Sequence, residues 1–173
     1  MAVILLRHTR PVGAEGLCYG RTDLALDDGF ASEAARLAEE LPSVRRILSS
    51  PLSRCRRLAE AIGAARDLAV EVDPRLAEMD FGTWEKTPWA EIPRDQLDAW
   101  AEDFLGARPH GGESVAELWA RVREALDAAV TGPVPVLAVT HAGVIKAALA
   151  SGKDMRGWQT ETDFGGWRRV DWP

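Results

Sequence analysis

The sequence predicts an α/β fold of three layers, α/β/α, in which a mostly parallel central sheet is covered by helices on both faces. Short runs rich in apolar residues, typical of buried strands, occur at 2–6, 44–48, 69–72 and 134–139. Stretches with apolar residues at helical spacing lie between these runs. Alternating strands and helices indicate parallel pairing, because each crossover helix returns the chain to the same end of the sheet.

Length and composition are those of one folded domain covering residues 1–173. Of the 173 residues, 46% are apolar and 28% are charged, and chains divide into several domains mainly beyond about 250–300 residues. A net charge of −6 argues against a general nucleic-acid-binding protein. No run approaches the roughly 18 apolar residues of a membrane helix, and the two cysteines lack disulfide-scaffold spacing. We therefore expect a cytoplasmic protein with no nucleic-acid or membrane partner.

A long loop separates the first strand from the first helix. Residues 2–6 are continuously apolar and predict a strand buried on both faces. Proline and several glycines between 11 and 26 indicate a loop. A helix follows, with apolar residues at helical spacing from Phe30 to Leu41 and Asp27 or Asp28 as its N-cap.

The next strand and helix complete the first half of the chain. Residues 44–48 predict a second strand, and the Ser-Ser-Pro segment at 49–51 is expected to open a helix. The apolar stripe of that helix runs from Cys55 to Ile62, and residues 69–72 predict a short third strand.

Regular patterning breaks down between residues 73 and 112. This stretch predicts an irregular, lid-like excursion inserted in the α/β core. One helix within it is expected to begin at Pro93, because a missing N–H costs nothing in the first turn. That helix would bury Leu97, Trp100 and Phe104.

Regular elements return after the excursion. The Ser-Val-Ala-Glu segment at 114–117 matches a capping box and predicts the start of an amphipathic helix. Residues 134–139 predict a strand, and 143–150 predict a helix that Gly152 ends. A final strand is expected around Val170.

Suggestive polar residues follow three of the expected strands. Arg7 and His8 follow the first strand, Arg54 follows the second, and His141 follows the strand at 134–139. Ligands of open α/β sheets collect at the carboxyl ends of the strands, so these four side chains are expected to converge. The chain has only three histidines. A lone histidine would be better explained as a capped or core residue, but a convergent pair with two arginines favours a site.

These four groups suit phosphoryl transfer. An arginine presents a planar fork of donors that matches phosphate oxygens and stays charged at any relevant pH. A neutral imidazole can attack phosphorus and form a covalent intermediate. The helix expected after His141 adds backbone N–H donors at its N-terminus. No metal is required, because arginines can neutralise the phosphate oxygens.

Five segments, in order along nearly the whole chain, resemble the motifs of the histidine phosphatase superfamily, also called the phosphoglycerate-mutase-like branch. The resemblance implies a phosphoglycerate-mutase-like α/β fold and a phosphohistidine mechanism. An Arg-His pair alone would be a weak signal, whereas five motifs in register are a specific one. The segments are LLRHT at 5–9, SSPLSRC at 49–55, LAEMDFGTWE at 76–85, GGES at 111–114 and VTHAGVI at 139–145.

Carried onto this sequence, the resemblance implies a role for each matching residue. His8 would be the nucleophile, Arg7 and Arg54 would clamp the phosphoryl oxygens, and His141 would donate to the oxygen where charge develops. Glu78 would be the proton donor to the leaving group and then the base for water. Considered alone, Glu78 would be better explained as a solvated surface carboxylate.

The residues after His8 depart from the commonest family pattern. Thr9 follows directly, and the segment from Gly16 to Leu24 contains Cys-Tyr-Gly. This form resembles the α-ribazole phosphatases of cobalamin assembly. The resemblance implies that Thr9 offers its hydroxyl to the phosphate and that Tyr19 and Arg21 line the substrate side of the pocket. A simple turn hydroxyl and ordinary loop packing are the alternative explanations.

Other polar and aromatic residues of the excursion can be explained by structural roles alone. Trp84, Trp89 and Trp100 could form an aromatic wall against a benzimidazole ring, but ordinary core packing is the better explanation. Glu85 is expected to be structural, and His110 is expected to be a loop residue.

The sequence therefore predicts a phosphomonoester hydrolase that needs no cofactor and acts on a small-molecule phosphate ester, with α-ribazole 5′-phosphate as the specific candidate. A broad-specificity small-molecule phosphatase is the main alternative. A phosphoglycerate mutase and a non-catalytic binding module of the same fold are further ones. The oligomeric state is left open, a dimer included.

Overall fold

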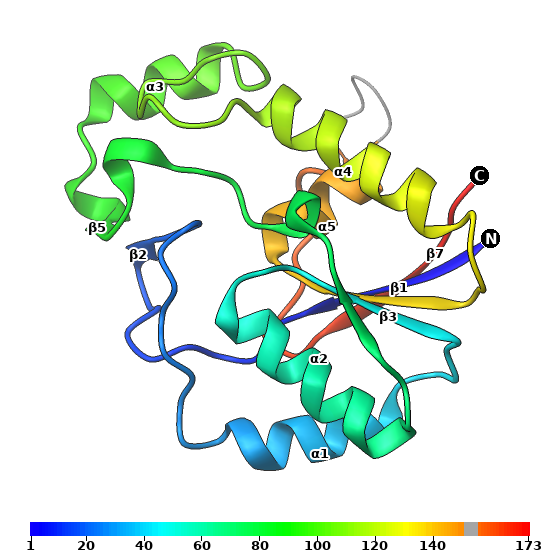
Figure 1. Ribbon diagram of the computed structural model, residues 1–173. Coiled ribbons are helices and arrows are strands. Elements are labelled where there is room, and N and C mark those ends of the chain that lie inside the picture. The colour runs from blue at the N-terminus through cyan, green and yellow to red at the C-terminus, as the bar shows by residue number, and fades with distance from the viewer. Residues whose placement is uncertain (151–155) are drawn as a thin grey trace.

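A five-stranded sheet forms the centre of the computed structural model, which describes residues 1–150 and 156–173 (Figure 1). Four strands are parallel, and the fifth runs antiparallel at one edge beside the first. The mostly parallel sheet expected from the sequence is confirmed. In spatial order the strands are β4 (Val70–Val72), β3 (Arg46–Ser49), β6 (Val136–Thr140), β1 (Ala2–Arg7) and β7 (Trp167–Asp171).

Helices cover both faces of this sheet, which confirms the three-layer prediction (Figure 1). One layer consists of α1 (Phe30–Glu40) and α2 (Ser53–Arg66), and the other of α4 (Val115–Ala129) and α5 (Ala142–Leu149). Alternate residues of β1 serve the two layers. Ile4 and Leu6 join the core beneath α1 and α2, whereas Val3 and Leu5 join the core beneath α4 and α5. Burial on both faces explains why β1 is continuously apolar.

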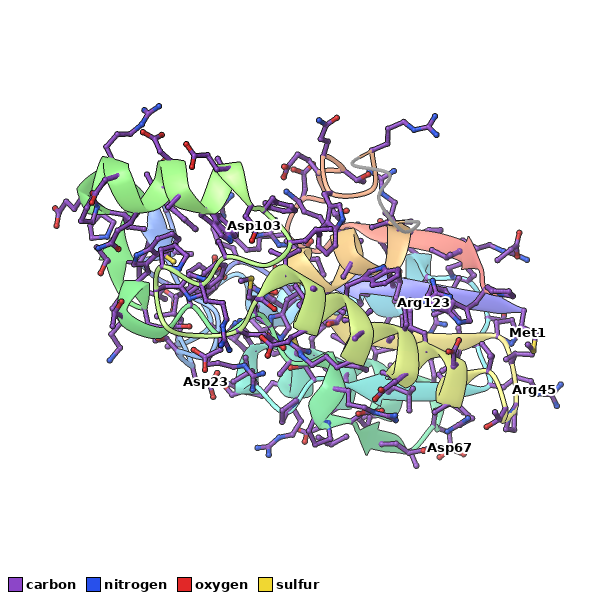
Figure 2. All side chains as sticks on the ribbon, turned by 90° about the horizontal axis from the view of Figure 1, so that it is seen from above. Met1, Asp23, Arg45, Asp67, Asp103 and Arg123 are labelled. Carbon is purple, nitrogen blue, oxygen red and sulfur yellow. The ribbon has the colours of Figure 1, made fainter. Side chains whose placement is uncertain are left out.

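Two excursions from the sheet meet beyond the carboxyl ends of the parallel strands. The loop expected at 11–26 contains a short strand, β2 (Leu17–Cys18), which pairs antiparallel with β5 (Thr87–Pro88) of the later excursion. In Figure 2, Asp23 of the first excursion and Asp103 of the second lie at the same end of the molecule, opposite Met1.

The second excursion is as irregular as the sequence predicted. It consists of α3 (Arg94–Glu102), β5 and three 3₁₀ turns, Pro74–Leu76, Gly82–Trp84 and Trp89–Glu91. A small apolar cluster of its own holds the two excursions together, because Cys18 packs in it with Trp84 and Ile92. Burial raises the pKa of the Cys18 thiol to about 12, so this residue is a small buried apolar group.

The first residues of two helices differ from the prediction, because the expected capping residues do not bind the free N–H groups there. The helix α1 begins after Gly29 with no side-chain cap; the Asp27 carboxylate accepts instead from the Gly29 N–H, closing a turn before the helix. The helix α2 begins at Ser53, later than the Ser-Ser-Pro segment. The Asp23 carboxylate, thirty residues away in sequence, accepts from the Ser53 N–H and hydroxyl.

Other boundaries shift by one or two residues. The strands β3, β4 and β6 start later than their apolar runs, and α5 starts one residue early. Pro93 precedes the first residue of α3 instead of occupying it, Phe104 lies beyond the end of that helix, and Leu97 and Trp100 are only half-buried. The strand expected at Val170 is β7. Gly152 lies outside the described residues. None of the helices in the described part of the chain is both long and apolar enough to cross a bilayer.

The capping box of α4 is present as predicted and supports a stability measurement. The Ser114 hydroxyl accepts from the Glu117 N–H, and the Glu117 side chain accepts from the Ser114 N–H. Replacing Ser114 with alanine removes one of these bonds and should lower the free energy of unfolding by about 1 kcal/mol. Urea denaturation measures this, with Ser43→Ala in an exposed loop as the control. Equal losses in the two variants would contradict the cap assignment.

Candidate active site

The pairing of β1 with β6 brings two histidines together. Arg7 lies opposite Thr140, so the residues that follow them, His8 and His141, leave neighbouring strands at the same edge of the sheet. Their ring centroids are 5.2 Å apart, in an edge-to-face arrangement. Both side chains are buried. The convergence of the histidines expected from the sequence is therefore present.

The hydrogen bonds of His8 fix its proton on Nδ1. That nitrogen lies 2.7 Å from the Thr9 carbonyl, which can only accept. On the other side of the ring, Nε2 lies 3.3 Å from Nε of Arg54, which can only donate. Burial, together with the nearby Arg54 and Arg7 guanidinium groups, lowers the pKa of His8 to about 3. His8 is therefore a neutral imidazole with the lone pair of Nε2 directed toward the cationic side of the site.

His141 lies at the N-cap of α5 in a fully buried position. Its Nε2 is 2.8 Å from the hydroxyl of Ser50 and 3.4 Å from Sγ of Cys55. Burial, with the adjacent His8 and Arg54, lowers the pKa of His141 well below its ordinary value. Ser50 belongs to the segment that we expected to open a helix, and its hydroxyl serves this ring instead.

Arg54 is completely buried in the first turn of α2. Its Nη1 donates to the Thr22 carbonyl at 2.8 Å and its Nη2 to the Gly20 carbonyl at 2.6 Å. The nearest carboxylate, that of Asp23, is 3.9 Å away. A guanidinium has five N–H donors. The two carbonyls and His8 do not use all of them, which leaves donors for an anion.

Arg7 approaches the site from the other side. Its guanidinium carbon lies 3.8 Å from the centre of the Phe164 ring, and Nη1 donates to the Thr162 carbonyl at 2.7 Å. Two buried polar atoms nearby have no hydrogen-bond partner in the described parts of the chain, Nε of Arg7 and Oγ1 of Thr9. Buried polar groups without partners are rare in folded proteins. Arg7 lines the cavity that holds His8, whereas Thr9 lines a neighbouring depression that it shares with Arg7.

Glu78 is nearly buried and faces the same space. Its two carboxylate oxygens accept from the backbone N–H groups of Met79 at 2.9 Å and Gly143 at 3.0 Å. A Cβ at position 143 would lie 2.3 Å from one of these oxygens, so glycine is required for this approach. Arg121 fixes the backbone around Glu78 by donating to the carbonyls of Arg75, Ala77 and Glu78.

A cavity of about 500 Å³ opens over His8. Its inner end holds Arg7, His8 and Glu78, and Lys146 and Arg10 are further cationic residues of its wall. The remaining wall comes from both excursions and from the segment after α5, and it is strongly aromatic. The aromatic lining residues are Tyr19, Phe81, Trp89, Trp100, Phe104, Trp158 and Phe164.

The other expected site residues have different surroundings. Tyr19 lines the cavity, and burial raises the pKa of its phenol. Arg21 does not line it, because its side chain is exposed and borders a separate surface depression. His110 packs against Trp84 and, as expected, lies in a loop outside the cavity. Trp84 belongs to the apolar cluster of the excursions.

Several residues that touch or support the site were not predicted from the sequence, and Phe164 and Arg121 are two of them. Phe164 stacks on Arg7 from the short segment before β7, and Arg121 lies on an ordinary amphipathic helix. Neither position carries a local pattern that distinguishes it. The described residues contain no cluster of three or more histidine, cysteine, aspartate or glutamate side chains that could hold a metal ion.

Comparison with known proteins agrees with this geometry. The chain is 32% identical over 167 residues to the glucosyl-3-phosphoglycerate phosphatase of Mycobacterium tuberculosis, which covers 86% of this chain and 74% of that protein. It is 29% identical over 140 residues to the probable phosphoglycerate mutase GpmB of Erwinia tasmaniensis, which covers 77% of this chain and 65% of that protein.

Among solved structures, TTHB049 from Thermus thermophilus superposes with a TM-score of 0.81 at 34% identity, covering all of this chain and 95% of that one. Residues 3–172 match the family described as the histidine phosphatase superfamily, branch 1. With the family's fold, and with two histidines and two arginines gathered at one sheet edge, the chain belongs to the histidine phosphatase superfamily.

Proposed function

We propose that this protein hydrolyses phosphate monoesters through a phosphohistidine on Nε2 of His8. The observation that carries the proposal is the protonation state of this buried imidazole. Its Nδ1 proton is held by the Thr9 carbonyl, so Nε2 carries the lone pair. That lone pair accepts from Nε of Arg54 in this structure, and it would attack phosphorus once the Arg54 donor turns to a phosphoryl oxygen. A nucleophile whose pKa is about 3 needs no deprotonation at neutral pH.

The reaction would proceed in two displacements. In the first, Nε2 of His8 forms a bond to phosphorus, the phosphorus–oxygen bond to the alcohol breaks, and Glu78 gives its proton to the leaving oxygen. In the second, Glu78 takes a proton from water as that water attacks phosphorus. The nitrogen–phosphorus bond then breaks, which releases inorganic phosphate and restores His8. The position of Glu78 at the inner end of the cavity supports this role.

Arg7, Arg54 and His141 would hold the phosphoryl oxygens during both steps. Both arginines have donors left over after their contacts with protein carbonyls, and charge-assisted bonds to phosphate oxygens are strong. The unpartnered hydroxyl of Thr9 would be a further donor. Bonds that tighten as charge builds on the oxygens lower the barrier. The proposed chemistry uses no metal or cofactor.

The cavity wall favours a neutral, planar leaving group. The named substrates of the two relatives contain phosphoglycerate, whose carboxylate calls for cationic partners. Here the cavity wall contains the cationic residues Arg10 and Lys146, but aromatic rings, including those of Trp89 and Trp100, outnumber them. We infer that the natural substrate is α-ribazole 5′-phosphate, whose benzimidazole would stack in this wall, and that Tyr19 contacts it. A broad-specificity small-molecule phosphatase is the second candidate, since aromatic surfaces accept many flat groups.

Replacing His8 with alanine should lower phosphate release by at least about a thousandfold, because the nucleophile is lost. Wild-type protein quenched during turnover of a ³²P-labelled ester should carry acid-labile, base-stable label. The variant should carry none. His110→Asn changes the third histidine, which lies outside the cavity, and should keep the label. Label on His8→Ala, or equal rates for the two proteins, would remove His8 from the mechanism.

Replacing Glu78 with glutamine should affect poor leaving groups most. Because Glu78 would protonate the departing alkoxide, kcat for an alkyl phosphate should fall by about 10²–10⁴-fold. The loss in the phosphorylation step should be much smaller for p-nitrophenyl phosphate, whose phenolate leaves without a proton. Burst kinetics separates this step from hydrolysis of the phosphoenzyme. Equal losses of the burst rate for the two esters would show that Glu78 is not the acid.

A substrate panel tests the assignment of the leaving group. Burial of a benzimidazole in the aromatic wall should raise kcat/KM for α-ribazole 5′-phosphate by about 10- to 100-fold over ribose 5-phosphate, which lacks the ring. Equal values would favour the broad-specificity alternative. Incubation with 3-phosphoglycerate and 2,3-bisphosphoglycerate should release phosphate. Isomerisation without release would instead identify a mutase.

A further inference from the structure

The carboxylate of Glu85 gathers five donors from two distant parts of the chain. It accepts from the backbone N–H groups of Gly20 at 3.1 Å, Arg21 at 2.9 Å and Thr22 at 3.1 Å, and from the Thr22 hydroxyl at 2.6 Å. The Phe81 N–H donates from its own excursion at 3.2 Å. Bonds to an ionised acceptor are roughly twice as strong as neutral ones. Glu85 therefore fixes the conformation of residues 20–22.

The ionised form of Glu85 is the one that this arrangement requires. Burial acts to raise its pKa, but the bonds from Thr22 and from the backbone N–H groups of Gly20 and Arg21 outweigh burial and lower it. A glutamine of the same shape has one accepting oxygen and an NH₂ group that donates. Its NH₂ would face N–H donors, so it could not reproduce the set.

The carbonyl groups of the same three-residue segment hold Arg54. Its two terminal nitrogens donate to the carbonyls of Gly20 and Thr22 at 2.6 Å and 2.8 Å, and its Nε donates to His8. A carboxylate directly bonded to Arg54 would set its direction, but Asp23 is 3.9 Å away. The two carbonyls are therefore the main constraint on this buried guanidinium.

The segment has little freedom to adjust if its anchor is removed. Gly20 packs so closely on the second excursion that a Cβ there would lie 1.8 Å from the Met79 carbonyl oxygen. A change in the backbone at 20–22 would therefore shift the carbonyls that Arg54 uses. It would also displace Tyr19, whose ring lies 5.1 Å from the Arg54 guanidinium.

We propose that Glu85 is a positioning residue, which orients Arg54 toward the phosphoryl group through the backbone of residues 20–22. The inference deepens the proposed function, because Arg54 is the group that would bind phosphate. The Glu85 carboxylate thus binds both the backbone that holds Arg54 and the N–H of Phe81, a residue of the cavity wall.

Binding of inorganic phosphate, measured by titration calorimetry, tests this without turnover. Glu85→Gln should weaken phosphate binding by about 10- to 100-fold, as expected when one charge-assisted contact of Arg54 is misdirected. Arg54→Ala should weaken it at least as much. In the Arg54→Ala background, Glu85→Gln should add less than about twofold, because residues acting through one contact are not additive. Multiplied losses would overturn the proposal, as would unchanged binding by folded Glu85→Gln.

Two further variants separate positioning from stability. Glu117→Gln removes a carboxylate that also accepts backbone and hydroxyl donors, but at the start of α4, and it should lower stability with phosphate affinity unchanged. Thr22→Val removes only the hydroxyl donor of Glu85 and carries the test if Glu85→Gln does not fold. It should weaken phosphate binding severalfold, and unchanged binding would overturn the proposal. A wild type that binds phosphate yet hydrolyses no ester would overturn the proposed function alone.

Discussion

Parallel pairing of β1 with β6 places Arg7 opposite Thr140, and the geometry of the proposed phosphate pocket follows from that register. His8 and His141 directly follow the last residues of these two strands, so the distance between them depends on how the two buried strands are aligned. Alternate residues of β1 belong to different helix layers. A slip of one residue would exchange these side chains between two differently packed cores. The apolar core thus specifies the register, and the register specifies the distance between the imidazoles. The chemistry of the pocket is therefore tied to the packing of the whole sheet.

The same arrangement makes the pocket a destabilising part of the fold. Burying His8 as a neutral base lowers its pKa from 6.5 to about 3, so between these values the unfolded chain binds a proton that the folded chain does not. Stability contributed at this position therefore falls as the pH drops through 6.5, by about 1.4 kcal/mol per pH unit. Unpartnered polar atoms on Arg7 and Thr9 add to the cost. In the proposed reaction, a phosphoryl group would accept from both. The features that destabilise the pocket are those that would favour an anion.

Local patterns in the sequence were enough for the strands and the α4 cap, because each depends on residues adjacent in the chain. The convergence of Arg7, His8, Arg54 and His141 was predictable because each follows a strand, and parallel strands end at the same edge of a sheet. The α2 cap was missed because its carboxylate, Asp23, comes from a distant loop. The pairing of β2 with β5 was missed because two residues per strand leave no periodic signal. Phe164 and Arg121 were missed because only the tertiary structure brings them to the site. Arg21, expected in the cavity from the resemblance, has an exposed side chain, and its contact with Glu85 is made by its backbone N–H.

The two excursions are not stabilised in the same way as the sheet. Neither has enough apolar residues to fold alone, and their shared cluster of Cys18, Trp84 and Ile92 is small. The Glu85 contacts add directional bonds where apolar area is scarce, and they do so at the backbone that Arg54 requires. Replacing residues of the aromatic wall can therefore change the leaving group, as long as residues 20–22 stay in place. In the proposed function, a single change at Glu85 would reach the phosphate side through the backbone of residues 20–22, which also adjoins Tyr19 of the cavity wall. Glu85 and Arg54 both bind the backbone of Gly20 and Thr22. In the proposed function, a mutation could change substrate selection without changing phosphate binding only if it leaves these bonds intact.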